Sequence, residues 1–209
     1  MSLHLDSLRI GLDGRDMVAL DLTVNAGEVL TIMGPSGCGK STLLTALVGA
    51  LGSPFTMTGR IVLDGRDVTG LPTDKRRMGL LFQDDVLFPH LSVAGNLGFG
   101  LPPRTPDRAA RIADALAAAE LDGMGSRDPA TLSGGQRARV ALMRMLLSAP
   151  RALLLDEPFS RLDADLRAQI RDFTFRQARA LPTVLVTHDL EDARAAQGRI
   201  LSVTGQVLN

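Results

Sequence analysis

Short hydrophobic runs alternate with longer amphipathic segments along most of this sequence. The runs are bounded by polar or glycine-rich stretches and predict β-strands at residues 3–10, 18–24, 29–33, 60–63, 78–82, 152–155, 183–187 and 199–203. Helical periodicity predicts helices at residues 42–50, 106–120, 135–148 and 164–180. The helix at 106–120 is Ala-rich, and Asp107 stands where its side chain could cap the first turn.

The order of these segments predicts an α/β fold. Strands that alternate with helices favour right-handed crossovers and a mostly parallel sheet with helices on both faces. The early region contains strands alone, which indicates a small antiparallel β layer. The stretch between Gln83 and Ser148 is almost wholly loop and helix. We therefore interpret residues 1–209 as one domain, with a core lobe at 1–83 and 149–209 and an inserted α-helical lobe at 84–148.

Composition narrows the class of protein. The chain has 209 residues, of which 45% are hydrophobic, so it can bury a substantial core. Its formal net charge is zero, and we expect no nucleic-acid partner. The single cysteine, Cys38, leaves no intrachain disulfide and suits a reducing compartment. Without a signal peptide or a run of about 18 apolar residues, a cytoplasmic protein that could dock on a membrane protein is expected.

A glycine-rich segment between an expected strand and an expected helix fits the pattern of a phosphate-binding loop. Its residues are Gly34, Pro35, Ser36, Gly37, Cys38, Gly39, Lys40, Ser41 and Thr42. Glycines let the backbone fold around phosphates with its N–H groups turned inward. We expect Lys40 to reach the β- and γ-phosphates, Ser41 to bind Mg²⁺, and Thr42 to lie nearer the α-phosphate. Cys38 is interpreted as a tolerated small residue rather than a redox switch.

Two carboxylates follow the apolar run at 152–155, at the strand end where parallel sheets bind ligands. Asp156 is expected to hold Mg²⁺, directly or through water. Glu157 is expected to orient and deprotonate the water that attacks the γ-phosphate. The alternative is an acidic turn ended by Pro158.

A third motif begins the amphipathic helix expected at 135–148 and consists of Leu132, Ser133, Gly134, Gly135 and Gln136. A serine and glycines ahead of a helix can form a pocket of backbone N–H groups that suits a phosphate. Taken alone, a capping serine with flexible glycines is the simpler interpretation.

The loop at 34–42, the motif at 132–136 and the pair Asp156 and Glu157 follow one another in this order along the chain. With them, the chain resembles the ATPase subunit of an ATP-binding cassette (ABC) transporter over nearly its whole length. The resemblance implies a P-loop NTPase core that binds ATP and Mg²⁺ and hydrolyses ATP. Gln83 is similar to the family's Q-loop glutamine, which senses Mg²⁺ and the γ-phosphate, and His188 to the switch histidine that helps to position the attacking water. Residues 160–163 resemble the D-loop with Asp163 as its acidic residue, although the family more often has Ala where Arg161 stands.

The resemblance also implies partners. In the family each nucleotide lies between the P-loop of one copy and the signature, here 132–136, of another, so a head-to-tail dimer is implied. Integral membrane permease subunits, a substrate-binding protein and a place on the inner face of the cell membrane are implied as well. Residues 84–93, which include Asp85, together with Asn96, are similar to the segment that forms the permease docking groove in importers.

The pattern is similar to the separate ATPase subunits of prokaryotic importers, in a branch near those for thiamine and inorganic anions. An exporter ATPase is one alternative. A soluble ABC ATPase in DNA repair or translation is another, although such proteins usually need a long heptad insertion or a second cassette, and this sequence has neither. A nucleotide-binding module that does not hydrolyse is disfavoured because Gln83, Glu157 and His188 are all present.

Two features depart from the family pattern. Residues 9–15, where the family usually has an aromatic side chain that stacks on adenine, contain none. Leu12 or an arginine would cover the base instead, and we expect a weaker preference for adenine. The sequence ends at Asn209, so we expect none of the regulatory domains that many importer ATPases carry.

Overall fold

The computed structural model describes residues 1–84 and 86–208, and these divide into two compact units. The first unit contains Met1–Leu80, Arg151–Glu157 and Gln177–Asn209, and the second contains Leu81–Pro150 and Pro158–Arg176. The second unit is larger than the lobe expected at 84–148, because Phe173 belongs to the same hydrophobic cluster as Val140 and Leu142.

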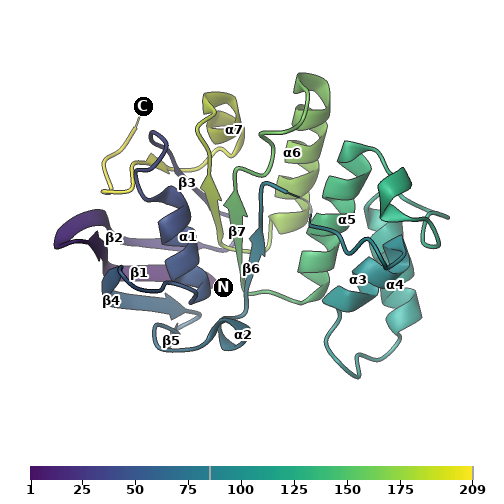
Figure 1. The fold of residues 1–209 in the computed structure, drawn as a ribbon, viewed down its shortest axis with the longest axis horizontal. Helices are drawn as coiled ribbons and strands as arrows, with labels where there is room; N and C mark the ends of the chain where they lie inside the picture. The colour runs from purple at the N-terminus through teal and green to yellow at the C-terminus, as the bar shows by residue number, and fades with distance from the viewer. Residues whose placement is uncertain (85, 209) are drawn as a thin grey trace. The chain divides into compact units, whose positions relative to one another are not determined.

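The elements follow one another as the hydrophobic pattern predicts, with some additions (Figure 1). The strands are β1 (Ser2–Leu12), β2 (Arg15–Asn25), β3 (Val29–Ile32), β4 (Thr56–Leu63), β5 (Arg66–Asp67), β6 (Met78–Leu81), β7 (Ala152–Asp156), β8 (Thr183–Val186) and β9 (Ile200–Leu201). The α-helices are α1 (Lys40–Val48), α2 (Thr73–Arg76), α3 (Val93–Gly100), α4 (Arg108–Ala118), α5 (Gly134–Leu147), α6 (Ala164–Ala178) and α7 (Leu190–Ala195), with a 3₁₀ turn at Pro129–Thr131. The helices expected at 42–50, 106–120, 135–148 and 164–180 are confirmed as α1, α4, α5 and α6.

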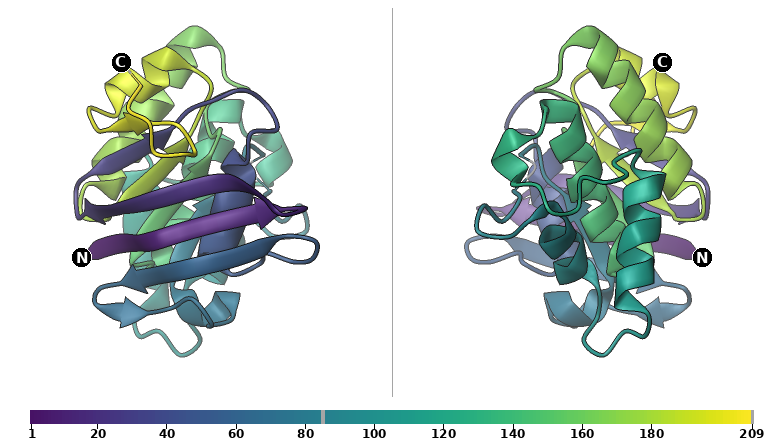
Figure 2. Two further views of the ribbon diagram at one scale, coloured as in Figure 1. Left: turned by 90° about the vertical axis from the view of Figure 1, so that its left-hand side faces the viewer. Right: turned by 90° about the vertical axis from the view of Figure 1, so that its right-hand side faces the viewer.

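The first unit contains an antiparallel sheet and a mostly parallel one, as expected. The antiparallel sheet has the order β2-β1-β4-β5, and its long strands lie side by side in the left view of Figure 2. The other sheet has the order β6-β7-β8-β3-β9, with parallel pairing of β7 with β8 and of β8 with β3. One hydrophobic core joins both sheets and α1 through residues such as Leu3, Leu47 and Val184. The predicted α/β fold class is therefore confirmed.

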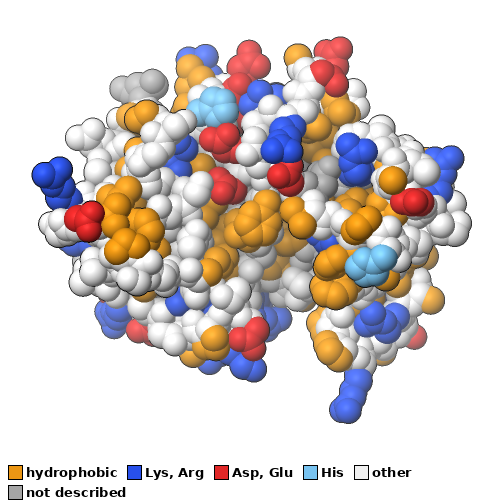
Figure 3. Space-filling view, viewed as in Figure 1, with side chains coloured by type: hydrophobic (Ala, Val, Ile, Leu, Met, Phe, Trp, Pro, Cys, Tyr) orange, Lys and Arg blue, Asp and Glu red, His pale blue; other side chains and the backbone are white. Residues whose placement is uncertain are grey.

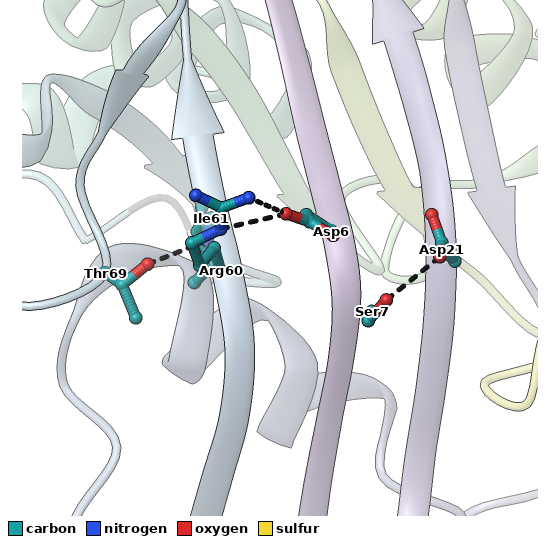
Figure 4. Close-up of polar contacts among 6 residues, drawn as sticks. All are labelled: Asp6, Ser7, Asp21, Arg60, Ile61 and Thr69. Atoms are coloured by element: carbon teal, nitrogen blue, oxygen red, sulfur yellow. Dashed lines mark hydrogen bonds and ion pairs between the residues drawn. The ribbon is translucent and has the colours of Figure 1, made fainter.

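Polar pairs cover one face of the antiparallel sheet, beside an irregularity in β1. Ser7 has a φ of 49°, and the register of β1 shifts there against both neighbouring strands. A Cβ at Gly59 would lie 2.3 Å from the Ser7 carbonyl oxygen, so this crossing requires glycine. Arg60 pairs with Asp6 at 2.5 Å, and the Ser7 hydroxyl donates to Asp21 at 3.1 Å. Both contacts are drawn in Figure 4.

Helix α3 belongs to the second unit and was not expected from the sequence, because glycines such as Gly98 and Gly100 disfavour helices. Its first turn is capped by Ser92, whose Oγ accepts the Gly95 N–H at 3.1 Å. A Cβ at Gly100 would lie 2.0 Å from the Arg144 carbonyl oxygen, so the glycine allows α3 and α5 to approach closely. Packing against α5 therefore stabilises α3, although the local helix propensity of its residues is low.

The expected cap of α4 by Asp107 is wrong. Asp107 occupies the N-cap position in a left-handed conformation (φ 52°), and its side chain makes no capping hydrogen bond. Arg108 instead donates to the Gly98 carbonyl at 2.6 Å and the Pro102 carbonyl at 3.1 Å, which ties the start of α4 to the end of α3. The short helices α2 and α7 were also not expected, since one or two turns are too short to show a period.

No helix within the described residues 1–84 and 86–208 is both long enough and apolar enough to cross a membrane.

Candidate functional site

The candidate phosphate-binding loop, residues 34–42, joins β3 to α1 in the first unit. Gly37 and Gly39 have φ values of 80° and 105°, which only glycine adopts without strain. Gly39 occupies the N-cap position of α1 without a side-chain capping bond, so the first N–H groups of the helix are open to an anion. Lys40 is 7% exposed and donates from Nζ to the Gly34 and Pro35 carbonyls at 2.8 and 2.9 Å. The loop thus carries a fixed positive charge beside helix-terminal donors.

Ser41 and Asp156 lie next to each other although α1 and β7 are distant in the sequence. The Ser41 hydroxyl donates to Asp156 Oδ1 at 3.3 Å. Burial raises the pKa of Asp156, and the neighbouring Glu157 carboxylate raises it further, while the Ser41 hydrogen bond and the Lys40 charge act in the opposite direction. A cation at this position would therefore stabilise the ionised form of Asp156.

These oxygen atoms suit a magnesium ion. Mg²⁺ prefers hydroxyl and carboxylate oxygens and is usually bound through one or two carboxylates together with substrate phosphates and water. Among the residues that the structure describes, no group of three or more His, Cys, Asp or Glu side chains could hold a metal ion. Ser41 and Asp156 could thus hold Mg²⁺ only in company with other ligands, as a nucleotide would provide.

Glu157 and His188 come together at the ends of β7 and β8. His188 Nδ1 lies 3.1 Å from Glu157 Oε2, and the side chains are 62% and 25% exposed. The Glu157 backbone has a φ of 47° and donates its N–H to the Val186 carbonyl at 2.9 Å. A glutamate in this conformation stores backbone strain of a kind found at functional sites.

Asp189 was not singled out from the sequence but helps to shape the segment after His188. Its Oδ1 accepts the backbone N–H groups of Glu191 and Asp192 at 2.7 and 3.2 Å, which caps α7. Its own N–H donates to the Thr187 hydroxyl at 3.0 Å. An aspartate before an acidic first helical turn is a recognisable N-cap signal and could have identified this residue.

The remaining candidate residues lie in the second unit. Ser133 caps α5 in a reciprocal arrangement, since its Oγ accepts the Gln136 N–H at 3.3 Å and Gln136 Oε1 accepts the Ser133 N–H at 3.0 Å. Leu132 is buried, and a Cβ at Gly135 would lie 2.5 Å from the Leu166 side chain. The capping interpretation of this motif is therefore confirmed, and it leaves the N–H groups of the glycines at the start of a helix.

Gln83 shares a cavity with part of that motif. The cavity has a volume of about 450 Å³, and its lining includes Gln83, Gly134, Arg161 and Leu162. Asp163 directly follows Leu162 in the sequence, and its Oδ1 accepts the Leu166 N–H at 3.1 Å at the start of α6. The expected site residues thus form one group in the first unit and another in the second.

The ABC transporter family model matches residues 17–160, which include the loop at 34–42, the motif at 132–136 and the pair Asp156 and Glu157. The chain belongs to the ABC transporter family. It is an ATPase of that family, and its relatives bear ATP-binding names. The expected resemblance is confirmed.

Relatives match almost the whole ABC ATPase chain. It is 51% identical over 193 residues to the uncharacterized ABC transporter ATP-binding protein YnjD of Escherichia coli K12, covering 90% of this chain and 88% of YnjD. It is 40% identical over 210 residues to the spermidine/putrescine import ATP-binding protein PotA of Salmonella typhimurium, covering 98% and 55% of the two chains. For the Fe(3+) ions import ATP-binding protein FbpC 1 of Rhizobium meliloti, the identity is 44% over 187 residues, covering 87% and 52%. The chain spans about half the length of these import proteins.

The turn between β1 and β2 lies within residues 9–15, the segment that contains no aromatic side chain to stack on adenine. Asp13 and Gly14 form the turn with φ values of 51° and 76°, and Leu12 ends β1 half-buried. The side chain of Met17 borders the phosphate-binding loop, since a Cβ at Gly39 would lie 3.6 Å from Met17 Cβ. Aliphatic and thioether surface therefore stands near the loop in this hairpin.

Proposed function

We propose that the chain is the ATP-hydrolysing subunit of an ABC importer for a small solute. The observation that carries this proposal is the match over 98% of the chain to an import ATP-binding protein. Relatives named for spermidine, Fe(3+) and sulfate import are all at least 40% identical to this chain, so the motor is similar across different cargoes. Cargo selection then belongs to permease and substrate-binding partners.

The first unit supplies the nucleotide-binding and water-activating groups of the proposal. Lys40 and the N–H groups at the start of α1 bind the β- and γ-phosphates. Ser41 and Asp156 would hold Mg²⁺, which when bound neutralises charge on the phosphates, and Gln83, which belongs to the second unit, is the further ligand that the family resemblance implies. Glu157 accepts the proton of the attacking water. His188, whose Nδ1 lies 3.1 Å from the Glu157 carboxylate, helps to position that water.

A second copy supplies the other half of each nucleotide site. The backbone N–H groups of Gly134 and Gly135, at the start of α5, are suited to the γ-phosphate held by the partner copy. Asp163 would lie near the same interface. ATP then joins two head-to-tail copies, and hydrolysis lets them separate and moves the attached permease subunits.

Permease docking is assigned to the surface formed by Asp84, residues 86–93 and α3. Phe82, Val86 and Phe99 are 54%, 58% and 66% exposed, and hydrophobic side chains lie on the surface over α3 and α4 in Figure 3. The fully buried Asn96 shapes the segment, since it accepts the Phe88 N–H at 2.8 Å and donates to the Phe88 carbonyl at 3.1 Å. Asp85 lies outside the described residues. Docking there would place the chain on the inner face of the cell membrane.

The test combines a hydrolysis assay with a dimerisation assay. The chain should hydrolyse ATP faster when reconstituted in vesicles with its candidate permease subunits than when alone. Glu157→Gln should lower hydrolysis about 10²- to 10⁴-fold and give an ATP-dependent dimer in light scattering. Glu191→Gln, an exposed glutamate of α7, is the matched control and should behave as the parent. Normal hydrolysis by Glu157→Gln would overturn the role of Glu157. Hydrolysis that no candidate permease changes would overturn the importer assignment.

A further inference from the structure

Arg161 and Asp84 form an ion pair within the second unit. Arg161 Nη1 donates to Asp84 Oδ1, and the two side chains are 61% and 59% exposed. Asp84 directly follows Gln83, and Arg161 lies in the segment that follows β7. The pair therefore links two segments that are 77 residues apart in the sequence.

Both partners line the cavity of about 450 Å³ that also contains Gln83. Most of the other lining residues are apolar or small, among them Leu87, Pro129 and Leu162. The cavity is open to solvent, and Gln83, Asp84 and Arg161 on its lining are exposed, so the two segments do not pack continuously against each other there. The Arg161–Asp84 contact is a charge-assisted hydrogen bond that joins the two segments directly at this point.

We propose that Arg161 is a positioning residue for ATP hydrolysis, which holds the Gln83 segment in place through Asp84. The proposal rests on the assignment of Gln83 to the nucleotide site in the proposed function. An alanine at position 161, as the family more often has, would offer no donor to Asp84. In this chain the segment beside Gln83 is preorganised by an added ion pair, and preorganisation of a reacting group raises kcat more than it changes KM.

The size of the effect follows from the exposure of the pair. An exposed ion pair contributes little, and salt screens it over a Debye length of about 10 Å at 0.1 M ionic strength. We expect Arg161→Ala to lower kcat about two- to fivefold at low salt with an unchanged KM for ATP. The ratio of parent to variant rates should approach one as the salt concentration rises toward about 1 M.

The variants for the full-length chain are Arg161→Ala, Asp84→Asn, Arg161→Lys and the exchange Asp84→Arg with Arg161→Asp. The two removals should have equal effects and should not add when combined, because they break the same contact. Arg161→Lys and the exchange should recover kcat to within about twofold of the parent. Arg60→Ala, which removes an arginine of similar exposure from its pair with Asp6 (Figure 4), is the control and should leave kcat unchanged. A purely structural role for Arg161 would lower the thermal midpoint and leave kcat alone.

Hydrogen–deuterium exchange provides a readout that does not depend on hydrolysis. Peptides covering 82–90 and 158–163 should exchange faster in Arg161→Ala than in the parent, and those covering β1 and β2 should not change. The positioning role is overturned by unchanged exchange in both segments, by equal kcat in parent and Arg161→Ala at low salt, or by additive removals. A parent chain without any ATPase activity would count against the proposed function, and the exchange result would still decide the link between Arg161 and Asp84.

Discussion

Replacing Gly134 by alanine separates the two interpretations of the motif at 132–136. A Cβ at Gly134 would have Arg137 Nη2 at 3.9 Å and Leu162 Cδ2 at 4.0 Å as its nearest neighbours, so the methyl group fits without displacing an atom. Alanine is favoured over glycine in a helix by up to about 1 kcal/mol. For a chain of this size, that corresponds to a thermal midpoint that is unchanged or raised by up to about 4 °C. Folding alone therefore gives no reason for glycine at this position.

ATP hydrolysis should respond in the opposite direction. If the N–H groups at the start of α5 approach a phosphate of the partner copy, an added methyl group obstructs that approach. We expect a fall in kcat/KM of at least about 100-fold, similar to the loss of one preorganised donor to a developing anion. Differential scanning calorimetry and a steady-state ATPase assay measure the two effects on one preparation. Gly52→Ala is the control, because nothing lies within 4 Å of the added Cβ. A Gly134→Ala chain as active as the parent would refute the phosphate-binding role and leave only a helix cap.

Three further predictions concern charge and nucleotide choice. Asp64 accepts the Ser2 N–H at 2.8 Å and pairs with Arg151 at 2.6 Å. Partial burial opposes its ionisation, but these partners lower its pKa. Asp64→Asn should therefore lower the free energy of unfolding by about 1–2 kcal/mol at pH 7, measured by chemical denaturation. That cost should be fully present above the unfolded-state pKa of about 3.9 and disappear as the pH falls through the lower folded value, and a cost independent of pH would contradict the assignment. For Asp156 burial raises the pKa, so ionisation lowers stability at neutral pH. Asp156→Asn should therefore raise the thermal midpoint at pH 7, and the difference in midpoint between variant and parent should vanish below about pH 3.9. The same variant should lose Mg²⁺-dependent ATP binding in titration calorimetry. Because no aromatic residue stands at 9–15, GTP should compete with ATP within about tenfold, and a strong preference for ATP in competition would show that Met17 or Leu12 selects adenine.

Local sequence patterns predicted the elements whose residues interact with near neighbours in the chain. The glycine loop before Lys40 and the serine cap at Ser133 could be read from adjacent residues, because loop conformation and helix capping are local properties. A local pattern was not always sufficient. Asp107 was expected to cap α4, but its side chain makes no capping hydrogen bond, and the Arg108 side chain ties that helix to α3. Helix α3 itself was missed because its stability comes from packing on α5.

The sequence by itself determined the family and the fold class, and it supplied the candidate catalytic residues. Only the tertiary structure decided which of these residues meet. Ser41 and Asp156 are 115 residues apart in the chain and 3.3 Å apart in space, and Arg161 reaches Asp84 across 77 residues. Such contacts form only when distant segments have been brought together, and burial of the whole core offsets the entropic cost of doing so. A hydrophobic pattern within a short stretch of sequence therefore cannot predict them. The phosphate-binding motif could be recognised from its letters, whereas the ion pair beside Gln83 could be found only in the folded chain.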